Sequence, residues 1–267
     1  MTTKRKFRGY KIRDLKISDA DLTTVNQLKS YHSTNFTPEV IFDIGANIGS
    51  FTVAFAKLFP YCSIYAFEPV KHTFKILSQN TEQFLNISSN NFGLSNKNKD
   101  KVPIGLPAIS DKKLQNYGRS TIHKYEGEPI DYIDLYKFSE ICKLNEVIPD
   151  IVKIDIEGCE YEILSEAEES GILSKIKLIY IELNNEYEES ARKSKNLLLK
   201  HFNVVNYTTN NTDNGAPLNF VFKNKELNFT DQDICGNRGY EEQLWKTNQL
   251  YTIDPKNGVL KLAQYEP

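Results

Sequence analysis

The sequence predicts an α/β domain whose mostly parallel sheet carries helices on both faces and whose last strand is antiparallel. Two observations and one general rule support this prediction. Short apolar runs alternate with segments in which apolar residues recur every three or four positions, which is the order of consecutive βαβ units. Right-handed crossovers between parallel strands place the helices on both faces. Finally, the turn-rich segment 210–215 separates two late strands and is short enough to make them an antiparallel pair.

The first half of the domain is expected to alternate strand and helix. The apolar run 40–42 ends at Asp43-Ile44-Gly45, as a parallel strand buried on both faces should. Gly49-Ser50 then opens a helix, which ends at Pro60 because proline interrupts helical hydrogen bonding. The elements expected next are a strand at 63–67, a helix marked by Phe74, Leu77 and Phe84, and a weaker strand at 91–94.

The second half resumes after a long connection at about 96–150. This connection is rich in Pro, Gly and Lys, and connections of such length usually carry function. It is expected to hold a strand near 121–124 and a helix at about 135–144. The elements expected after it are a strand at 151–156, a helix marked by Ile163, Leu164 and Ala167, a strand at 178–183, a helix near 187–201, and strands at 203–208 and 219–222.

These elements divide the chain into three parts. Residues 1–38 form a polar N-terminal extension with a weak helical pattern at 22–31, for which Ser18-Asp19 is a candidate N-cap. Residues 39–224 form the central domain. Residues 225–267 form a C-terminal extension with too little periodicity for any element to be assigned.

Composition excludes several classes of protein. The chain has 267 residues and a formal net charge of -2, so it has no global field that would attract nucleic acid or an anionic membrane. No apolar run approaches the roughly 18 residues of a membrane span, and the basic N-terminus has no apolar stretch behind it, as a signal peptide would. The four cysteines lack the close spacing of zinc sites or disulfide frameworks, which favours a cytoplasmic protein.

The first chemical signal is the glycine turn between Asp43 and Ser50. A turn that leaves a strand and enters a helix needs glycine for unusual dihedral angles and for close approach to a ligand. The free N–H groups of the helix start can then bind a polar or anionic group, such as the carboxylate of a methionine moiety. A tight turn without any ligand would show the same residues.

The second signal is Glu68, which lies 23 positions beyond Gly45 at the end of the second strand. An acidic side chain there can accept hydrogen bonds from both ribose hydroxyls of an adenosine, and NAD and S-adenosylmethionine both place a ribose at this point. The glycine pattern separates them. Gly45 and Gly49 are four residues apart with Asn47 between them, a turn that suits the methyl donor better than a pyrophosphate.

The third signal is the segment 152–160, Val-Lys-Ile-Asp-Ile-Glu-Gly-Cys-Glu. Strand alternation puts Lys153, Asp155 and Glu157 on one side, at the crevice where open α/β sheets bind ligands, and makes them candidate catalytic residues. Two structural roles compete with catalysis. Glu157 and Glu160 can stabilise the start of the next helix through its dipole, and Lys153 can simply pair with a carboxylate.

With these motifs in place, the sequence resembles the FkbM family of S-adenosylmethionine-dependent methyltransferases over about 39–224. The residues that carry the resemblance are 42–49, Phe67-Glu68-Pro69, the segment 152–158 with Glu160, and Ile181-Glu182. The resemblance implies a Rossmann-like class I methyltransferase fold and O-methylation of sugars, in surface polysaccharides or glycolipids, or of secondary metabolites. The residues expected at the cofactor are Asp43, Gly45, Ala46, Asn47, Gly49, Ser50, Glu68 and Gly93.

The acceptor is expected to be a small-molecule or glycan hydroxyl, bound near Tyr117, Arg119 and His123 in the long connection. This segment offers an aromatic face, hydrogen-bond donors and an arginine that could clamp a phosphate. Asp155, His123 or His72 could take the hydroxyl proton. A Mg²⁺ held by Asp155 and Glu157 is a less favoured route, because no third ligand is evident.

Two other functions stay open from the sequence. An NAD-dependent oxidoreductase or epimerase would need a Tyr-x-x-x-Lys pair, but near Lys137 the chain offers only Tyr132 and Tyr136, at the wrong spacing. A non-catalytic adenosine-binding module would keep the glycine turn and Glu68 without the chemistry. RNA methylation has only the basic cluster at 4–8 in its support, and the net charge opposes it.

Overall fold

The computed structural model describes residues 4–7, 10–13, 38–106, 117–123, 125, 127–183, 188–209, 218–226, 252–253 and 260–261. The elements of the central part are β3 (Val40–Ile44), α2 (Ser50–Leu58), β4 (Ser63–Phe67), α3 (Lys71–Thr81), β5 (Ile87–Asn90), β6 (Gly93–Ser95), β7 (Lys99–Ile104), the 3₁₀ turn η1 (Tyr117–Arg119), β8 (Asp131–Lys137), α4 (Phe138–Leu144), β9 (Ile151–Ile154), α5 (Glu160–Glu169), the 3₁₀ turn η2 (Leu173–Lys175), β10 (Leu178–Leu183), α6 (Glu188–His201), β11 (Phe202–Thr209) and β12 (Leu218–Asn224). Outside it lie two antiparallel pairs, β1 (Lys4–Phe7) with β2 (Tyr10–Arg13) and β13 (Thr252–Ile253) with β14 (Leu260–Lys261). The predicted helix at 22–31 and the turn at 210–215 lie outside the described residues.

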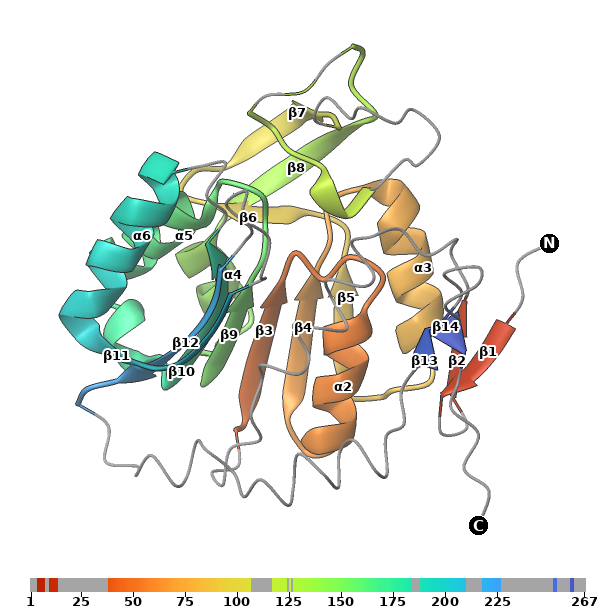
Figure 1. Ribbon diagram of the computed structural model, residues 1–267, viewed down its shortest axis with the longest axis horizontal. Coiled ribbons are helices and arrows are strands. Elements are labelled where there is room, and N and C mark those ends of the chain that lie inside the picture. Colours follow the sequence, from red (N-terminus) through yellow and green to blue (C-terminus); the bar gives the residue numbers. More distant parts are fainter. Residues whose placement is uncertain are drawn as a thin grey trace.

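A seven-stranded sheet in the order β11-β12-β10-β9-β3-β4-β5 forms the centre of the molecule (Figure 1). Strand β12 runs antiparallel to both β10 and β11, whereas β10, β9, β3, β4 and β5 are parallel. The predicted Rossmann-like fold is therefore confirmed. The antiparallel strand β12 is the last of these seven strands along the chain, but it lies inside the sheet, between β10 and β11.

Helices cover both faces of this sheet, as predicted (Figure 1). On one face, Phe51 and Phe55 of α2 pack over the central strands, and Leu77 of α3 joins Ala66 of β4. On the other face, α4, α5 and α6 bury a larger core around Phe42, one of the many side chains there that are less than 2% exposed. Burial on both faces explains why the central strands are almost continuously apolar.

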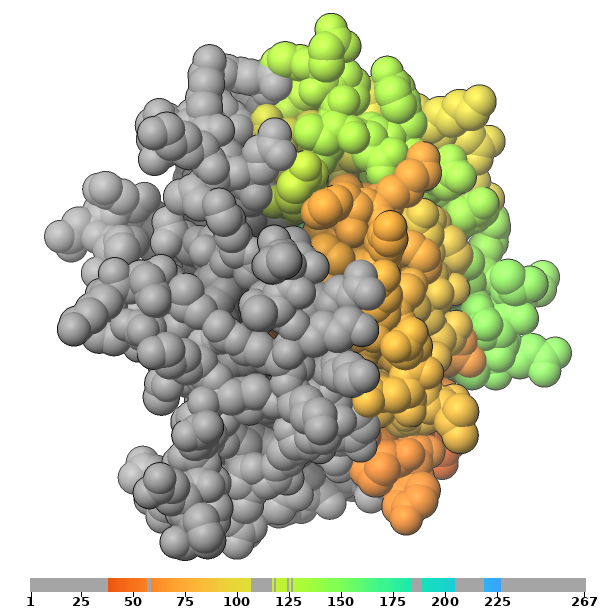
Figure 2. Space-filling view, turned by 90° about the vertical axis from the view of Figure 1, so that its right-hand side faces the viewer, coloured from red at the N-terminus to blue at the C-terminus, as the bar shows by residue number. Residues whose placement is uncertain are grey.

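A second, three-stranded sheet in the order β6-β8-β7 lies beyond the carboxyl ends of the main strands (Figure 1). The turn η1 joins it to the rest of the domain, because Gly105 and Thr121 exchange backbone hydrogen bonds and the Tyr117 ring stacks on His72 of α3 with ring centroids 4.6 Å apart. Figure 2 shows the yellow-green surface of this part directly beside the orange surface of the first βαβ units. The small sheet thus covers the edge at which open α/β sheets bind ligands, and it is called the roof below.

Four predicted elements were wrong in place or type. The third strand of the main sheet is 87–90 rather than 91–94, because an edge strand does not need an apolar run and Ser88 and Ser89 occupy its middle. In place of the strand expected near 121–124, Thr121 forms only an isolated bridge with Gly105, and residue 124 lies outside the described residues. Residues 131–137 are a strand, so the helix expected at 135–144 begins at 138, and the strand expected at 151–156 ends at 154.

No helix in the part of the chain that the structure describes is both long and apolar enough to cross a membrane.

Candidate functional site

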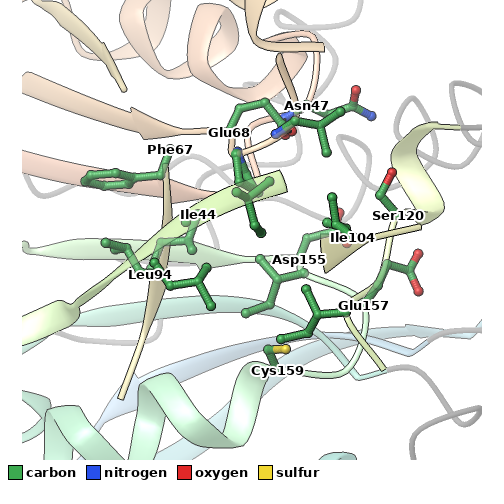
Figure 3. Close-up of a pocket in the computed structure, with 18 of the residues that line it drawn as sticks. Ile44, Asn47, Phe67, Glu68, Leu94, Ile104, Ser120, Asp155, Glu157 and Cys159 are labelled. Carbon is green, nitrogen blue, oxygen red and sulfur yellow. Dashed lines mark hydrogen bonds between the residues drawn. The ribbon is translucent and has the colours of Figure 1, made fainter. Parts of the chain in front are cut away.

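An open pocket of about 800 Å³ lies between the carboxyl ends of β3, β4 and β9 and the roof formed by the small sheet. In Figure 3, Asn47 and Glu68 lie at one end and Cys159 at the other, with Asp155 between them. The residues that line the pocket are Ile44, Gly45, Asn47, Phe67, Glu68, Pro69, Val70, Gly93, Leu94, Ser95, Ile104, Tyr117, Ser120, Ile122, Ile133, Leu135, Asp155, Ile156, Glu157 and Cys159.

The glycine turn takes left-handed backbone conformations at Gly45 (φ 77°), Asn47 (φ 50°) and Gly49 (φ 90°). A Cβ on Gly45 would lie 1.9 Å from the backbone oxygen of Asp155, so the close approach that demands glycine is made by the protein itself. This contact brings the turn after β3 against the turn after β9. Gly45 therefore sets the distance between the cofactor and catalytic segments predicted from the sequence.

Glu68 is held rigidly at one end of the pocket. Its Oε2 accepts a hydrogen bond from the Asn47 N–H at 2.8 Å, and its Oε1 accepts from the Val70 N–H at 2.9 Å and from the Thr73 hydroxyl at 2.8 Å. The side chain is 7% exposed, and this burial raises its pKa, against which the three donors act. A carboxyl group fixed in this way is suited to accept hydrogen bonds from a ligand diol.

Two of the predicted site residues, Asp43 and Lys153, lie beneath the pocket lining. The Lys153 ammonium donates a hydrogen bond to the Gly45 carbonyl at 2.8 Å and lies 3.4 Å from Asp43 Oδ1 and 3.6 Å from Asp155 Oδ2. The Asp43 carboxylate is fully buried and also accepts from the Thr52 hydroxyl at 2.6 Å. Burial lowers the pKa of Lys153, but the neighbouring carboxylates outweigh it and leave the pKa raised. Lys153 thus connects the turns after β3 and β9.

The chain turns after β9, so the alternation of side chains that the sequence predicted for a strand at 151–156 ends at Ile154. Glu157 (φ 50°) and Gly158 (φ 105°) turn the chain, so Asp155 and Glu157 both line the pocket while Glu160 turns inward. The Glu160 carboxyl is 2% exposed and accepts from the Gly158 N–H at 2.9 Å in the first turn of α5, and burial raises its pKa to about 7. Asp155 and Glu157 thus line the pocket, whereas Glu160 does not.

The segment after η1 meets this turn. The Thr121 hydroxyl donates to the Glu157 carbonyl at 3.2 Å, and the His123 Nε2 lies 3.2 Å from the Cys159 sulfur. Tyr117, Ser120 and Ile122 line the pocket, whereas Arg119 and His123, also predicted to bind the acceptor, are not among the residues that line it.

Several pocket residues had no signal in the sequence. Cys159 looked like an isolated thiol, and Ile104, Ile133 and Leu135 look like ordinary core positions until the small sheet places them over the pocket. Glu182, buried behind Asp155, was part of the family resemblance but had no assigned role. Its position at the end of the strand next to β9 is the signal that could have found it. Among the described residues, no three His, Cys, Asp or Glu side chains are arranged to hold a metal ion.

The other predicted cofactor residues belong to the glycine turn, to the start of α2, or to strand β6 of the small sheet. Gly93 lines the pocket beneath Leu135, whose side chain would lie 2.7 Å from a Cβ at this position. Ala46 is buried against Ala66 and Leu77, Gly49 precedes α2, and Ser50 is its first residue.

Comparisons with known proteins find methyltransferases among the relatives of this chain. The hexuronic acid methyltransferase AglP of Haloferax volcanii is 26% identical over 149 residues, which are 55% of this chain and 56% of that protein. The methyltransferase sdnD of Sordaria araneosa is 25% identical over 158 residues, covering 48% of this chain and 60% of that protein. The chain thus spans little more than half the length of these relatives.

Among solved structures, TYW2 of M. jannaschii in complex with AdoMet is 14% identical, with a TM-score of 0.42 over 84% of this chain and 86% of that one. A likeness this distant carries no functional information. The family comparison is more extensive, because the model of the methyltransferase FkbM domain matches residues 43–210, which include the end of β3, the pocket, and strands β4 to β11. The chain belongs to the FkbM methyltransferase family.

Proposed function

We propose that this protein is an S-adenosylmethionine-dependent O-methyltransferase that acts on a hydroxyl group of a sugar, a glycan precursor or a secondary metabolite. One observation carries the proposal: the anchored carboxyl of Glu68 and the carboxylate of Asp155 face the same pocket, at the carboxyl edge of the sheet. The first suits an adenosine ribose and the second a reacting hydroxyl. Membership of the FkbM family supports the same reaction.

The residues of the pocket fit the methyl donor in three parts. Glu68 would accept hydrogen bonds from the ribose hydroxyls, and the turn at 45–49 would hold the methionine end. The apolar side chains of Val70 and Leu135, which belong to one buried cluster under the roof, would cover the adenine. When bound, the donor supplies a methyl group that is already strongly electrophilic, so alignment of the acceptor can provide much of the catalysis.

Asp155 is the residue of this chain that would take the acceptor's proton. It lines the pocket, and Lys153 compensates its charge from below at 3.6 Å. Glu157 and Ser120 line the pocket on the same side, where they could bind further hydroxyls of a polyhydroxylated acceptor (Figure 3). We propose that the reaction needs no metal ion, so chelation with EDTA should leave the rate unchanged.

The acceptor class is supported by the relatives and by the segment near η1. One relative is named as a methyltransferase of hexuronic acid, a sugar derivative. Arg119 stands in the sequence between Tyr117 and Ser120, which line the pocket, and would bind a phosphate or carboxylate of an acceptor. Nucleic acid is not favoured, because the net charge is -2.

Two experiments test the proposal. Calorimetric titration with S-adenosylmethionine, S-adenosylhomocysteine and NAD separates a methyltransferase from an oxidoreductase. A screen of glycans, sugar nucleotides, catechols and short capped RNAs with radiolabelled methyl donor then identifies the acceptor. Label transfer to RNA or catechol, with none to any carbohydrate, would overturn the sugar assignment but not the cofactor.

A further inference from the structure

A second carboxyl group lies directly behind Asp155. In the ladder between β10 and β9, Ile181 pairs with Ile154, so Glu182 comes level with Asp155 one position later. Residues at the same level of adjacent parallel strands point to the same face. The side chains of Glu182 and Asp155 accordingly lie within hydrogen-bonding reach of each other.

Glu182 is buried and has few compensating charges around it. Glu182 is 8% exposed. Its partner on the neighbouring strand β12 is Asn219, which is 3% exposed. In the part of the chain that the structure describes, the Asn219 Oδ1 has no hydrogen-bond partner. Asp155 and Glu157 place two negative groups beside it. Lys153 is the cation that faces this group.

The positive charge of Lys153 already compensates two other carboxylates. Its ammonium lies 3.4 Å from Asp43 and 3.6 Å from Asp155, so it cannot also neutralise an ionised Glu182. Asp155 lines the pocket and its side chain is 22% exposed, whereas Glu182 is buried, and two adjacent carboxyl groups in such a site avoid a double negative charge by sharing one proton. Because Lys153 stabilises the charge of Asp155, the proton belongs on Glu182. Burial, followed by the charges of Asp155 and Glu157, raises the pKa of Glu182 well above its usual value.

We propose that Glu182 is the positioning residue of Asp155: it carries a proton and donates it as a hydrogen bond to one carboxylate oxygen of Asp155, which leaves the other oxygen directed to the acceptor. This inference rests on the proposed function. As the acceptor oxygen bonds to the methyl carbon, the electron pair of the breaking carbon–sulfur bond stays on sulfur, and the acceptor's proton passes to Asp155.

Two substitutions of Glu182 separate the effect of its hydrogen bond to Asp155 from the effect of its ionisation. Glu182→Gln keeps an N–H donor toward Asp155 but cannot ionise, whereas Glu182→Leu removes the donor. In the unmodified protein, kcat should fall on the alkaline side, where Glu182 loses its proton and repels Asp155. We expect Glu182→Gln to retain most of the neutral kcat and to lose this alkaline fall. Glu182→Leu should lower kcat by about 10- to 100-fold, less than loss of a general base, and leave the affinity for S-adenosylhomocysteine within about twofold.

Glu160→Gln is the matched control, because Glu160 is another buried carboxyl near Asp155, and it accepts its hydrogen bonds from the Gly158 N–H and the Ser190 hydroxyl. It should keep the alkaline fall of kcat. A fall that persists unchanged in Glu182→Gln, or that disappears in Glu160→Gln instead, would overturn the assignment.

Carboxyl ¹³C NMR of glutamate-labelled protein tests the proton itself without any acceptor. The resonance that is missing in Glu182→Gln should titrate well above the ordinary glutamate range. A titration in the ordinary range overturns the inference even in a protein that methylates every expected acceptor. Failure to bind S-adenosylhomocysteine or to transfer methyl would instead overturn the proposed function, so the two failures are distinguishable.

Discussion

The backbone N–H of Asn47 donates a hydrogen bond to Glu68 Oε2 at 2.8 Å, which joins the two cofactor motifs recognised in the sequence into one structural unit. Asn47 follows β3 and Glu68 follows β4, and these strands are neighbours in the sheet. The bond fixes the orientation of the carboxyl group before any ligand arrives. A preorganised acceptor loses less entropy on binding.

Replacement of Glu68 should weaken cofactor binding. We expect Glu68→Ala to lower the affinity for S-adenosylhomocysteine by about 1.5–3 kcal/mol, the usual contribution of hydrogen bonds to a charged group, as measured by calorimetry. Thr73→Val is the control, because it removes one of the three donors to Glu68 and keeps the carboxyl group. Equal affinity of Glu68→Ala and the parent would show that Glu68 does not bind the ribose.

A side chain at Gly45 should disturb the fold as well as the ligand. The Cβ of Gly45→Ala would lie 1.9 Å from the Asp155 carbonyl, so we expect destabilisation of more than about 2 kcal/mol in urea unfolding. Gly171 has a similar φ of 71° but no atom within 4 Å of a Cβ, so Gly171→Ala should cost only the strain of about 1–2 kcal/mol. Equal losses in both variants would mean that the clash relaxes freely. Because a Cβ at Gly45 would clash with the Asp155 backbone, room for a ligand is not the only reason for a glycine at this position.

Substitution of Asp155 should affect turnover more than cofactor affinity. Asp155→Asn keeps the shape and removes the charge, and we expect kcat to fall by about 10²-fold or more with little change in S-adenosylhomocysteine binding. A decrease of less than about threefold would argue against Asp155 as the proton acceptor. Loss of the parent's activity in EDTA, restored by Mg²⁺, would favour the metal route instead.

Glu160 should make stability depend on pH. Its pKa is about 7 in the folded protein and 4.5 ordinarily, so the folded state holds the proton more tightly. The resulting stabilisation is complete below about pH 4.5 and is lost as the pH rises through 7. In Glu160→Gln this component of the pH dependence should disappear from the free energy of unfolding. Identical pH profiles for the variant and the parent between pH 4.5 and 7 would contradict the assignment.

The segment around η1 should determine affinity for the acceptor. Tyr117 lines the pocket and stacks on His72, and Arg119 lies in the same turn. We expect Tyr117→Ala and Arg119→Ala to raise KM for the acceptor several-fold while the affinity for S-adenosylhomocysteine changes less. Tyr132→Ala, on the exposed part of β8, is a control that should change neither. Unchanged KM in both pocket-side variants would remove this segment from the acceptor site.

The sequence predicted the main sheet better than the roof, for physical reasons. Strands such as 63–67 and 178–183 are buried on both faces and therefore appear as apolar runs. Edge strand β5 carries Ser88 and Ser89, and β8 alternates buried and exposed residues within a stretch that also has a helix-like spacing. Their type depends on pairing with distant strands, which local periodicity does not record.

The same distinction holds for the site. Gly45, Glu68 and Asp155 follow strands and could be located from the sequence, because the carboxyl ends of parallel strands meet at one edge. The sequence could not show that Lys153 faces Gly45 and Asp43 beneath the pocket, since this depends on the turn after β9 lying against the turn after β3. Nor could it show that His123 and Cys159 meet, because they come from segments 36 residues apart.

Calorimetric titration of the purified full chain with S-adenosylhomocysteine and with NAD tests the central claim most directly. The fit of the pocket to adenosine and a methionine moiety, without a pyrophosphate site, predicts saturable 1:1 binding of S-adenosylhomocysteine and none of NAD at the same concentrations. Binding of NAD with no binding of S-adenosylhomocysteine, or of neither, would contradict the account.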